Sequence, residues 1–313
     1  MIAVHHLWKI YGDFVAVKDL SFTVNKGEIV GFLGPNGAGK TTTMRVLTCF
    51  MPPSKGEVTI AGHDVRDDSM AARRLIGYLP EQPPLYLDMT VEEYLRFVAR
   101  IKLIPGGKVK AAVERVVELC GLAEMRKRLI RKLSKGYRQR VGLAAALVHD
   151  PDILILNEPT VGLDPNQIVE IRNLIKKLGK EKTVILCSHI LAEVELTCNR
   201  ILIINEGQIV ASGTPAELKS EVEGHASLRV VVRGEKKAIV EVMKAIPGVK
   251  GVRAHAAKEK GALILEIETA KKKDLREAVT QAIFENHFTL LEIHKEFVSL
   301  EEIFNQVTQN NKD

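Results

Sequence analysis

Residues 29–42 read Ile-Val-Gly-Phe-Leu-Gly-Pro-Asn-Gly-Ala-Gly-Lys-Thr-Thr, and this stretch decides the fold class of the chain. The apolar run Ile29–Leu33 predicts a buried strand, and Thr42–Cys49 is compatible with a helix. Between them, Gly34–Thr41 satisfies the pattern G-x-x-x-x-G-K-[ST]. Glycine lets backbone N–H groups turn inward around phosphate oxygens, which a Cβ would obstruct. The alternative, a glycine-rich turn used only for packing, is disfavoured by the lysine, the threonine and the flanking elements.

Three kinds of group would hold a phosphate in this loop. Lys40 supplies a positive charge to the β- and γ-phosphates, and the Thr41 hydroxyl supplies a ligand to Mg²⁺. The N-terminus of the helix at 42–49 adds partial positive charge. The nucleotide-binding residues predicted in this stretch are Gly34, Pro35, Asn36, Gly37, Ala38, Gly39, Lys40, Thr41 and Thr42.

Four further motifs narrow the choice, because kinases, GTPases and many ATPases share a phosphate loop. Leu133-Ser-Lys-Gly-Tyr137 stands at the head of a predicted helix, Gly136–His149. Ile153-Leu-Ile-Leu-Asn-Glu158 is an apolar strand that ends in two polar residues, and Gly162-Leu-Asp164 follows it. Ser188-His189 closes the next predicted strand.

In this order the motifs resemble the ATP-binding subunit of ABC transporters, and the resemblance covers residues 2 to about 220. It implies an α/β nucleotide-binding domain that binds ATP and Mg²⁺ and hydrolyses ATP. It also implies that two such subunits pair head to tail around ATP, as a homodimer or a heterodimer. Tyr11 falls where the family places an aromatic side chain on adenine, although a core or edge aromatic is almost as common an explanation.

The resemblance also assigns a role to each later motif. Glu158 would be the general base that polarises the attacking water, and His189 would contact the γ-phosphate. Ser134 and Gly136 of one subunit would close over the ATP held by the other. Asp164 lies in the loop that follows the catalytic strand and is expected near the nucleotide.

Three positions depart from the family pattern. Leu133–Tyr137 has Lys-Gly-Tyr where Gly-Gly-Gln is commonest, a variant known among export-type members. In Gly77-Tyr-Leu-Pro-Glu81-Gln82 the position that usually contacts Mg²⁺ is Glu81, and the glutamine follows one place later as Gln82. Either side chain could reach the metal. Alternatively, both residues could only form the connection to the helices that follow. Asn157 replaces the aspartate that normally fixes Mg²⁺. Its amide offers an oxygen without a charge, so weaker metal holding is expected.

The chain is predicted to contain two domains. Residues 1–222 form the ATP-binding domain, and its apolar runs predict at least partly parallel strands at 29–33, 58–60, 76–79, 153–156, 184–187 and 201–204. A helical subdomain at about 84–149 begins with a capping box of Thr90 and Glu93, and Pro105-Gly106-Gly107 is expected to end its first helix. After a joint at 221–224, residues 225–313 alternate as βαββαβ, typical of a small ferredoxin-like α+β domain, with a terminal helix at 299–309.

Composition limits the classes of partner. The 45 Lys and Arg residues against 39 Asp and Glu give a mixed surface in spite of a net charge of +6. Basic residues gather at Arg126–Arg140, where Tyr137 is the only aromatic, so no nucleic-acid partner is expected. This cluster is expected to be a solvated face or to surround a polyphosphate. Four separated cysteines predict reduced, buried thiols. No uncharged apolar run is long enough to predict a membrane span, and the N-terminus does not resemble a secretory signal.

Transport by such a chain would need a separate membrane permease. The resemblance implies that the helical segment after residue 86 contacts the permease. The small tail and the ending Ser299–Phe304 resemble exporters of the ABC-2 type, which implies a permease of that type and a place on the cytoplasmic face of the membrane. Two alternatives stay open: a non-hydrolysing, ATP-gated regulatory subunit, prompted by Asn157, and a soluble ABC ATPase not engaged in transport.

Overall fold

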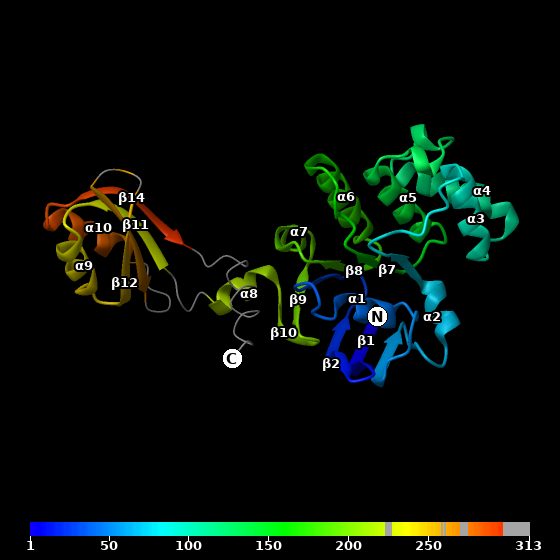
Figure 1. Ribbon diagram of the computed structural model, residues 1–313, viewed down its shortest axis with the longest axis horizontal. Coiled ribbons are helices and arrows are strands. Elements are labelled where there is room, and N and C mark those ends of the chain that lie inside the picture. Colours follow the sequence, from blue (N-terminus) through cyan, green and yellow to red (C-terminus); the bar gives the residue numbers. More distant parts are fainter. Residues whose placement is uncertain (223–226, 258, 260, 270–274, 297–313) are drawn as a thin grey trace. The chain divides into compact units, whose positions relative to one another are not determined.

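The computed structural model describes residues 1–222, 227–257, 259, 261–269 and 275–296 (Figure 1). Its contacts divide the chain into two units, Met1–Thr214 and Pro215–Asp313. The predicted first domain extended to residue 222, whereas helix α8 (Pro215–Val222) falls in the second unit. None of the described helices is both long enough and apolar enough to cross a membrane.

A six-stranded sheet of the first unit has the order β10-β9-β3-β8-β7-β6. Its strands are β3 (Ile29–Leu33), β6 (Ile76–Leu79), β7 (Ile153–Asn157), β8 (Thr183–Ser188), β9 (Arg200–Asn205) and β10 (Gln208–Gly213). All neighbouring pairs are parallel except β10 with β9. Every residue of β3, β7 and β8 is buried, which explains why these runs are largely apolar rather than alternating. The predicted partly parallel sheet is confirmed.

A second, antiparallel sheet of the first unit has the order β2-β1-β4-β5. It consists of β1 (Ile2–Tyr11), β2 (Phe14–Val24), β4 (Lys55–Ile60) and β5 (His63–Asp64). The strand predicted at 58–60 belongs to this sheet. One hydrophobic core joins the two sheets to helix α1 (Lys40–Leu47): the rings of Phe22 and Phe32 lie 5.8 Å apart, and Met44 of α1 is buried with them. The remaining connecting helices are α2 (Ser69–Leu75), α6 (Pro165–Leu178) and α7 (Leu191–Thr197).

Residues 80–152, all of which the structure describes, contain helices and no named strand. The helices are α3 (Val91–Ile101), α4 (Gly106–Leu119) and α5 (Lys135–Leu147), with short 3₁₀ turns at Ala123–Met125 and Ile130–Lys132. The predicted capping box is confirmed, because Thr90 and Glu93 exchange side-chain and backbone hydrogen bonds at the start of α3. The expected role of Pro105-Gly106-Gly107 is wrong. Pro105 occupies the N-cap of α4, where a missing N–H is tolerated, and both glycines begin that helix.

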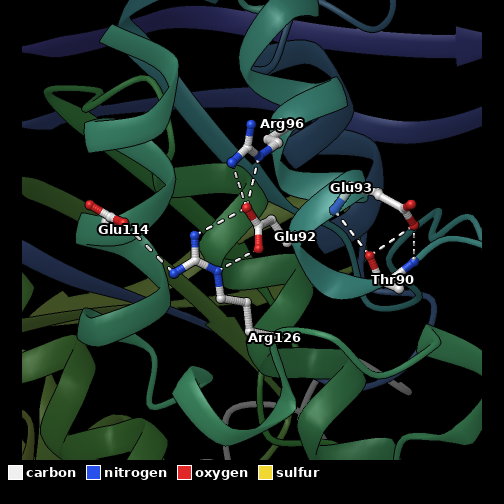
Figure 2. Close-up of polar contacts among 6 residues, drawn as sticks. All are labelled: Thr90, Glu92, Glu93, Arg96, Glu114 and Arg126. Atoms are coloured by element: carbon white, nitrogen blue, oxygen red, sulfur yellow. Dashed lines mark hydrogen bonds and ion pairs between the residues drawn. The ribbon is translucent and has the colours of Figure 1, made fainter.

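Figure 2 shows a cluster of charged side chains, the Glu92 clamp (Glu92, Arg96, Glu114 and Arg126), between the start of α3 and the chain that leads to α5. The Glu92 carboxylate accepts hydrogen bonds from Arg126 at 2.6 and 3.0 Å and from Arg96 at 2.6 and 2.9 Å. Glu114 lies 3.7 Å from Arg126. The hydrogen bond from Arg126, helped by Arg96, lowers the pKa of Glu92 to about 2. The backbone N–H of Glu92 also donates to the Arg126 carbonyl at 3.0 Å, so the clamp ties two distant segments together.

The second unit contains strands β11 (Ser227–Arg233), β12 (Val249–Ala256), β13 (Ala262–Thr269) and β14 (Thr289–Glu296), with helices α9 (Lys236–Lys244) and α10 (Arg276–Glu285). The strands pair antiparallel in the order β12-β13-β11-β14. Ile239 of α9 and Val279 of α10 share a buried core with Val230 of β11. The predicted order βαββαβ is therefore present in the described residues, whereas the helix predicted at 299–309 lies outside them.

All four cysteines are free and buried, as predicted: Cys49, Cys120, Cys187 and Cys198. Burial raises the pKa of the Cys120 and Cys187 thiols to about 12. These thiols therefore belong to the core of the first unit, and burial disfavours their reactive thiolate form.

Candidate functional site

Most of the predicted site residues converge at one edge of the six-stranded sheet. Parallel strands place their carboxyl ends at the same edge, where open α/β sheets bind their ligands. Leu33 at the end of β3 pairs with Ser188 of β8, and Asn157 at the end of β7 pairs with Cys187. The glycine-rich loop, the Asn157-Glu158 pair and His189 therefore emerge side by side from three adjacent strands.

The backbone of the glycine-rich loop has a conformation that suits glycine. Gly37 and Gly39 have φ angles of 83° and 98°, in the left-handed region. A Cβ on Gly39 would lie 2.5 Å from the carbonyl oxygen of Ala16, so another residue could not fit there. Among the described residues no side chain caps α1, and its first turn contains no acidic residue. The N–H groups at the start of α1 are thus available to an anion.

Lys40 and the loop line a cavity of about 240 Å³, which we call the loop cavity. The buried ammonium group of Lys40 donates to the carbonyl oxygens of Gly34 at 2.7 Å and Pro35 at 2.9 Å. An ammonium carries three donors, so one remains for a further acceptor. The lining residues are Phe14, Ala16, Asn36, Gly37, Gly39, Lys40, Thr41, Thr42, Glu81 and Glu158. The cavity therefore combines a cation, hydroxyl groups and two carboxylates.

Asn157 and Glu158 are deeply buried polar residues, with 2% and 6% of their surface exposed. The Asn157 Oδ1 and Glu158 Oε2 atoms have no hydrogen-bond donor in the described part of the chain. Glu158 also has a φ angle of 51°, in the left-handed region that costs free energy for a residue with a Cβ. Unsatisfied buried oxygens and an unfavourable backbone angle at one place are typical of a binding or catalytic site.

His189 lies against Glu158 on the solvent side. Its Nδ1 atom is 2.9 Å from Glu158 Oε2, close enough for an ion pair, although the two groups are not aligned as a hydrogen bond. The His189 side chain is 45% exposed, whereas the Glu158 side chain is 8% exposed. The structure thus brings together the two residues predicted to be catalytic.

The oxygen atoms near the loop fit the chemistry of Mg²⁺, which prefers hard oxygen ligands. Thr41 and Glu81 line both the loop cavity and a second, larger hollow that adjoins it, the groove. Asn157, whose amide oxygen has no aligned donor among the described residues, lines the groove. Gln82 lines the groove and not the loop cavity. No group of three or more His, Cys, Asp or Glu side chains that could hold a metal occurs among the described residues, so phosphate or water would have to complete the coordination.

The aromatic residue that lines the loop cavity is Phe14, and the adenine contact of Tyr11 stays a prediction. Tyr11 donates its hydroxyl to the Met51 sulfur at 2.9 Å, and Lys9 lies over its ring, whereas Phe14 lines the cavity. Phe14 was missed because it begins β2 directly after the turn that follows Tyr11, and a lone exposed aromatic gives no distinctive spacing.

Three predicted nucleotide-binding residues lie away from the loop cavity of their own chain. Ser134 is the exposed N-cap of α5, and its hydroxyl accepts from the Tyr137 N–H at 3.4 Å. Gly136 is buried. A Cβ at this position would collide with the amide group of the Gln167 side chain unless that side chain moved. Asp164 is the N-cap of α6, where its carboxylate accepts from the Gln167 N–H at 3.0 Å. Asp164 followed by Pro165 is a helix-start signal in the sequence, which explains this use of the carboxylate.

Arginines of the basic stretch 126–140 are engaged within the chain. Arg126 belongs to the Glu92 clamp, Arg131 pairs with Asp88 at 3.0 Å, and Arg140 pairs with Glu170. Arg138 donates to the carbonyl oxygens of 130 and 131. Arg126, Arg138 and Arg140 therefore hold loops and helices of the first unit together, whereas the Arg131–Asp88 pair is exposed and belongs to a solvated face.

A groove of about 630 Å³ adjoins the loop cavity. Its walls come from α1, the end of β6 and the turn after it, α3 and α5. Aromatic and apolar side chains dominate the lining, and two cations, Arg45 and Lys102, stand among them. The apolar and aromatic lining residues include Phe50, Tyr78, Leu79, Pro83, Pro84, Tyr94 and Val98.

Comparisons with known proteins agree with this site. A family model described as ABC transporter matches residues 17–161. The linearmycin resistance ATP-binding protein LnrL of Bacillus subtilis is 33% identical over 309 residues, which cover 98% of each chain. The bacitracin transport ATP-binding protein BcrA of Bacillus licheniformis is 42% identical over 212 residues, 67% of this chain and 68% of BcrA.

Two solved structures show the same relationship. The ATP-binding subunit of an ABC transporter covers 71% of this chain and 93% of its own length, with a TM-score of 0.65 and 30% identity. A dimeric ATP-binding cassette, MJ0796, in a post-hydrolysis state with ADP and Pi covers 68% of this chain and 98% of its own, with a TM-score of 0.63 and 27% identity. With the phosphate loop, the buried Glu158 and its histidine neighbour at one sheet edge, the chain belongs to the ATP-binding, ATP-hydrolysing subunits of ABC transporters.

Proposed function

We propose that this ATP-hydrolysing subunit powers a membrane permease of the ABC-2 type in the export direction, from the cytoplasmic face of the membrane. The observation that carries the hydrolytic part is the buried carboxylate of Glu158, which lacks an aligned donor among the described residues beside the loop of Lys40. A buried polar atom of this kind is costly unless a ligand completes it. The direction is supported by the similarity to a linearmycin resistance protein and a bacitracin transport protein.

ATP would place its phosphates in the loop cavity. Lys40 and the N–H groups at the start of α1 would meet the negative charge of the β- and γ-phosphates. Glu158 accepts a proton from a water molecule as the water oxygen attacks the γ-phosphorus, and ADP leaves with the electrons of the broken P–O bond. His189, 2.9 Å from Glu158, contacts the γ-phosphate and limits the movement of the base.

Mg²⁺ bound at this edge would neutralise phosphate charge. The groups that would hold it are the Thr41 hydroxyl, the Glu81 carboxylate and the amide oxygen of Asn157. Glu81 is favoured over Gln82 because only Glu81 lines the loop cavity. Asn157 contributes no charge. Glu81 would therefore supply the carboxylate that an aspartate at position 157 supplies in other family members.

Phe14, rather than Tyr11, would contact the adenine ring. Phe14 lines the loop cavity, whereas the Tyr11 hydroxyl is bonded to Met51. Phe14→Ala should then weaken ATP binding more than Tyr11→Ala does, in an equilibrium titration of the purified protein. A larger loss with Tyr11→Ala would return the adenine contact to Tyr11.

Two copies, or this chain and a different subunit, would enclose the nucleotide. Ser134, Gly136 and Asp164 lie outside the loop cavity of their own chain, so they would act on the ATP held by the partner. The exposed N-cap of α5 suits this role, because the N-terminus of a helix attracts phosphate. The dimeric state of the similar cassette bound to ADP and Pi supports the pairing.

The groove would receive the permease. Its aromatic and apolar lining suits an amphipathic helix, and Arg45 and Lys102 suit an acidic side chain on that helix. The groove shares Thr41 and Glu81 with the loop cavity, so an occupant would reach the nucleotide site directly. We also assign the βαββαβ order and antiparallel sheet of the second unit to the ferredoxin-like class.

A non-hydrolysing, ATP-gated regulatory subunit is the second candidate. Asn157 favours it, because a neutral side chain stands where a charge would hold Mg²⁺. ATP turnover by the purified chain together with its permease separates the two candidates, since a regulatory subunit would bind ATP without consuming it.

The decisive experiment compares Glu158→Gln with Lys40→Ala. Removing a general base should lower turnover by on the order of a hundredfold or more. Glu158→Gln should keep ATP and elute as a nucleotide-bound dimer in size-exclusion chromatography, whereas Lys40→Ala should lose ATP affinity and elute as a monomer. An unchanged turnover in Glu158→Gln would remove Glu158 as the base. Equal ATP binding by both variants would contradict their separate roles.

A further inference from the structure

Two buried side chains lie behind the catalytic edge and take no part in the nucleotide contacts proposed above. Thr160 and Glu193 are 4% and 7% exposed. The Thr160 hydroxyl donates a hydrogen bond to Oε2 of Glu193. Thr160 follows Glu158 in the chain, and Glu193 lies in the first turn of α7, just after His189. The hydrogen bond therefore connects the segment after the base with the segment after the histidine.

The backbone alone does not hold these two segments together. Strands β7 and β8 are parallel neighbours, and the Glu158 N–H still donates to the Cys187 carbonyl at 2.8 Å. At Glu158 the chain turns through a left-handed angle and leaves the ladder, while β8 ends at Ser188. The Thr160–Glu193 bond is a buried link beyond the end of the sheet.

We propose that Thr160 and Glu193 form a positioning pair for ATP hydrolysis, which keeps His189 Nδ1 and Glu158 Oε2 in their 2.9 Å contact. The inference rests on the proposed roles of Glu158 and His189. That contact has no aligned hydrogen bond of its own, and nearly half of the His189 side-chain surface is exposed, so the surrounding chain must fix the contact. A misplacement of about 1 Å at a reacting group can cost on the order of a hundredfold in rate.

The link, rather than the charge of Glu193, is the useful feature. A second carboxylate close to Glu158 is unfavourable: burial first, and then the charge of Glu158, raises the pKa of Glu193. The Thr160 hydrogen bond and the charges of His189 and Arg172 act in the opposite direction. The unfavourable proximity of Glu193 to Glu158 is offset if the Glu193 carboxylate oxygen anchors Thr160.

Three single variants separate the link from the charge, and two more serve as controls. Thr160→Val removes the hydroxyl at nearly constant shape, and Thr160→Ser keeps it. Glu193→Gln removes the charge but keeps an oxygen that can accept from Thr160. Thr197→Val is the matched control, because Thr197 is a second buried threonine, at the far end of α7. Thr160→Ala is measured in parallel in case the valine methyl group prevents folding.

Steady-state ATP turnover of the full-length protein gives kcat and KM for each variant. Thr160→Val and Thr160→Ala should lower kcat roughly tenfold, about 1.4 kcal/mol in barrier, at unchanged KM for ATP. Thr160→Ser, Glu193→Gln and Thr197→Val should stay within about threefold of the wild type. In a His189→Ala background Thr160→Val should have much less effect, because its target is already gone.

Three results would overturn the proposal: wild-type kcat in Thr160→Val and Thr160→Ala, a larger loss in Glu193→Gln than in Thr160→Val, or an unchanged effect of Thr160→Val in the His189→Ala background. Glu158→Gln distinguishes this failure from failure of the hydrolytic assignment. If Glu158→Gln abolishes turnover while Thr160→Val does not change it, only the positioning pair is wrong.

Discussion

Glu92 and Glu158 are carboxylates of the same unit in opposite surroundings. Glu92 accepts hydrogen bonds from two guanidinium groups, and its pKa falls to about 2 (Figure 2). Glu158 is more deeply buried, has an oxygen without an aligned donor among the described residues, and adopts a left-handed backbone angle. A carboxylate with aligned donors on both oxygens adds to the stability of the fold, whereas one whose histidine neighbour is not aligned keeps bonding capacity for a ligand. The comparison predicts that changes at the two places affect different measurements.

The largest effect on stability is expected at the clamp. Glu92→Gln keeps one acceptor and loses the charge that pairs with Arg126 and Arg96, so the free energy of unfolding should fall by roughly 2 kcal/mol. Urea unfolding followed by the fluorescence of Trp8, the only tryptophan and a residue of β1, reports on the first unit. Glu114→Gln is the control, since Glu114 lies 3.7 Å from Arg126 and should matter little. ATP affinity should not change. A loss of ATP binding in Glu92→Gln would contradict the separation between a stabilising carboxylate at Glu92 and a functional one at Glu158.

The pH dependence of the same variant sharpens this prediction. The pKa of Glu92 is lowered from 4.5 to about 2 by hydrogen bonding to Arg126 and Arg96, so its ionised form is favoured in the folded state. The stabilisation is complete above pH 4.5 and is lost as the pH falls toward 2. The stability difference between the wild type and Glu92→Gln should therefore narrow between pH 5 and pH 3 in urea titrations. A constant difference would mean that charge does not carry the effect.

At the sheet edge the expected effect is on turnover. Asn157→Asp adds the charge that Mg²⁺ prefers, and a charge-assisted bond exceeds a neutral one by about 1.4 kcal/mol, which is roughly tenfold in rate. ATP turnover should rise by on the order of tenfold, or the Mg²⁺ concentration for half-maximal rate should fall. The free energy of unfolding should not rise, because the new carboxylate stands next to buried Glu158. No gain in either kinetic quantity would reject the argument from the missing charge.

Glu81 tests whether a neighbour already supplies part of that charge. If it does, Glu81→Gln should harm the natural chain more than it harms the Asn157→Asp variant. Turnover against Mg²⁺ for the four combinations forms a double-mutant cycle. Strictly additive effects would show that Glu81 does not compensate for Asn157.

The smallest effect is expected at the capping box beside the clamp. Thr90→Ala removes the acceptor of the Glu93 N–H and should cost about 1 kcal/mol of stability without a change in turnover. Thr90→Ser retains the hydroxyl and should restore most of the loss in the same urea titration. A turnover defect in Thr90→Ala would show that the two regions are coupled.

The fold could be predicted where the signal is local. Buried parallel strands such as β3 and β7 are continuous apolar runs, and the capping box is a four-residue pattern. The six predicted strands do not include β1 or β2, because register shifts between Val4 and Ile10 break the alternation that would reveal half-buried strands. The pairing of Arg126 could not be predicted for a related reason, since Arg126 meets Glu92 only through the tertiary fold.

The site could be predicted because its residues follow strand ends in a recurring order. The glycine-rich loop that ends in Lys40, the Asn157-Glu158 pair and His189 each follow an apolar strand, so their convergence follows from a parallel sheet. The Thr160–Glu193 link and the position of Phe14 at the cavity have no such signal. Each depends on how two loops pack, which spacing along the chain does not contain.

The four buried cysteines have a practical consequence for following this protein in solution. Thiol reagents attack the thiolate, so Cys120 and Cys187, with pKa values of about 12 and no access from solvent, will be modified only when the core opens. A cysteine placed at exposed Tyr86 would therefore react with a fluorophore reagent much faster than Cys120 and Cys187 do. The rate at which Cys120 and Cys187 become modified, measured with and without ATP, reports how often the interior of the first unit opens.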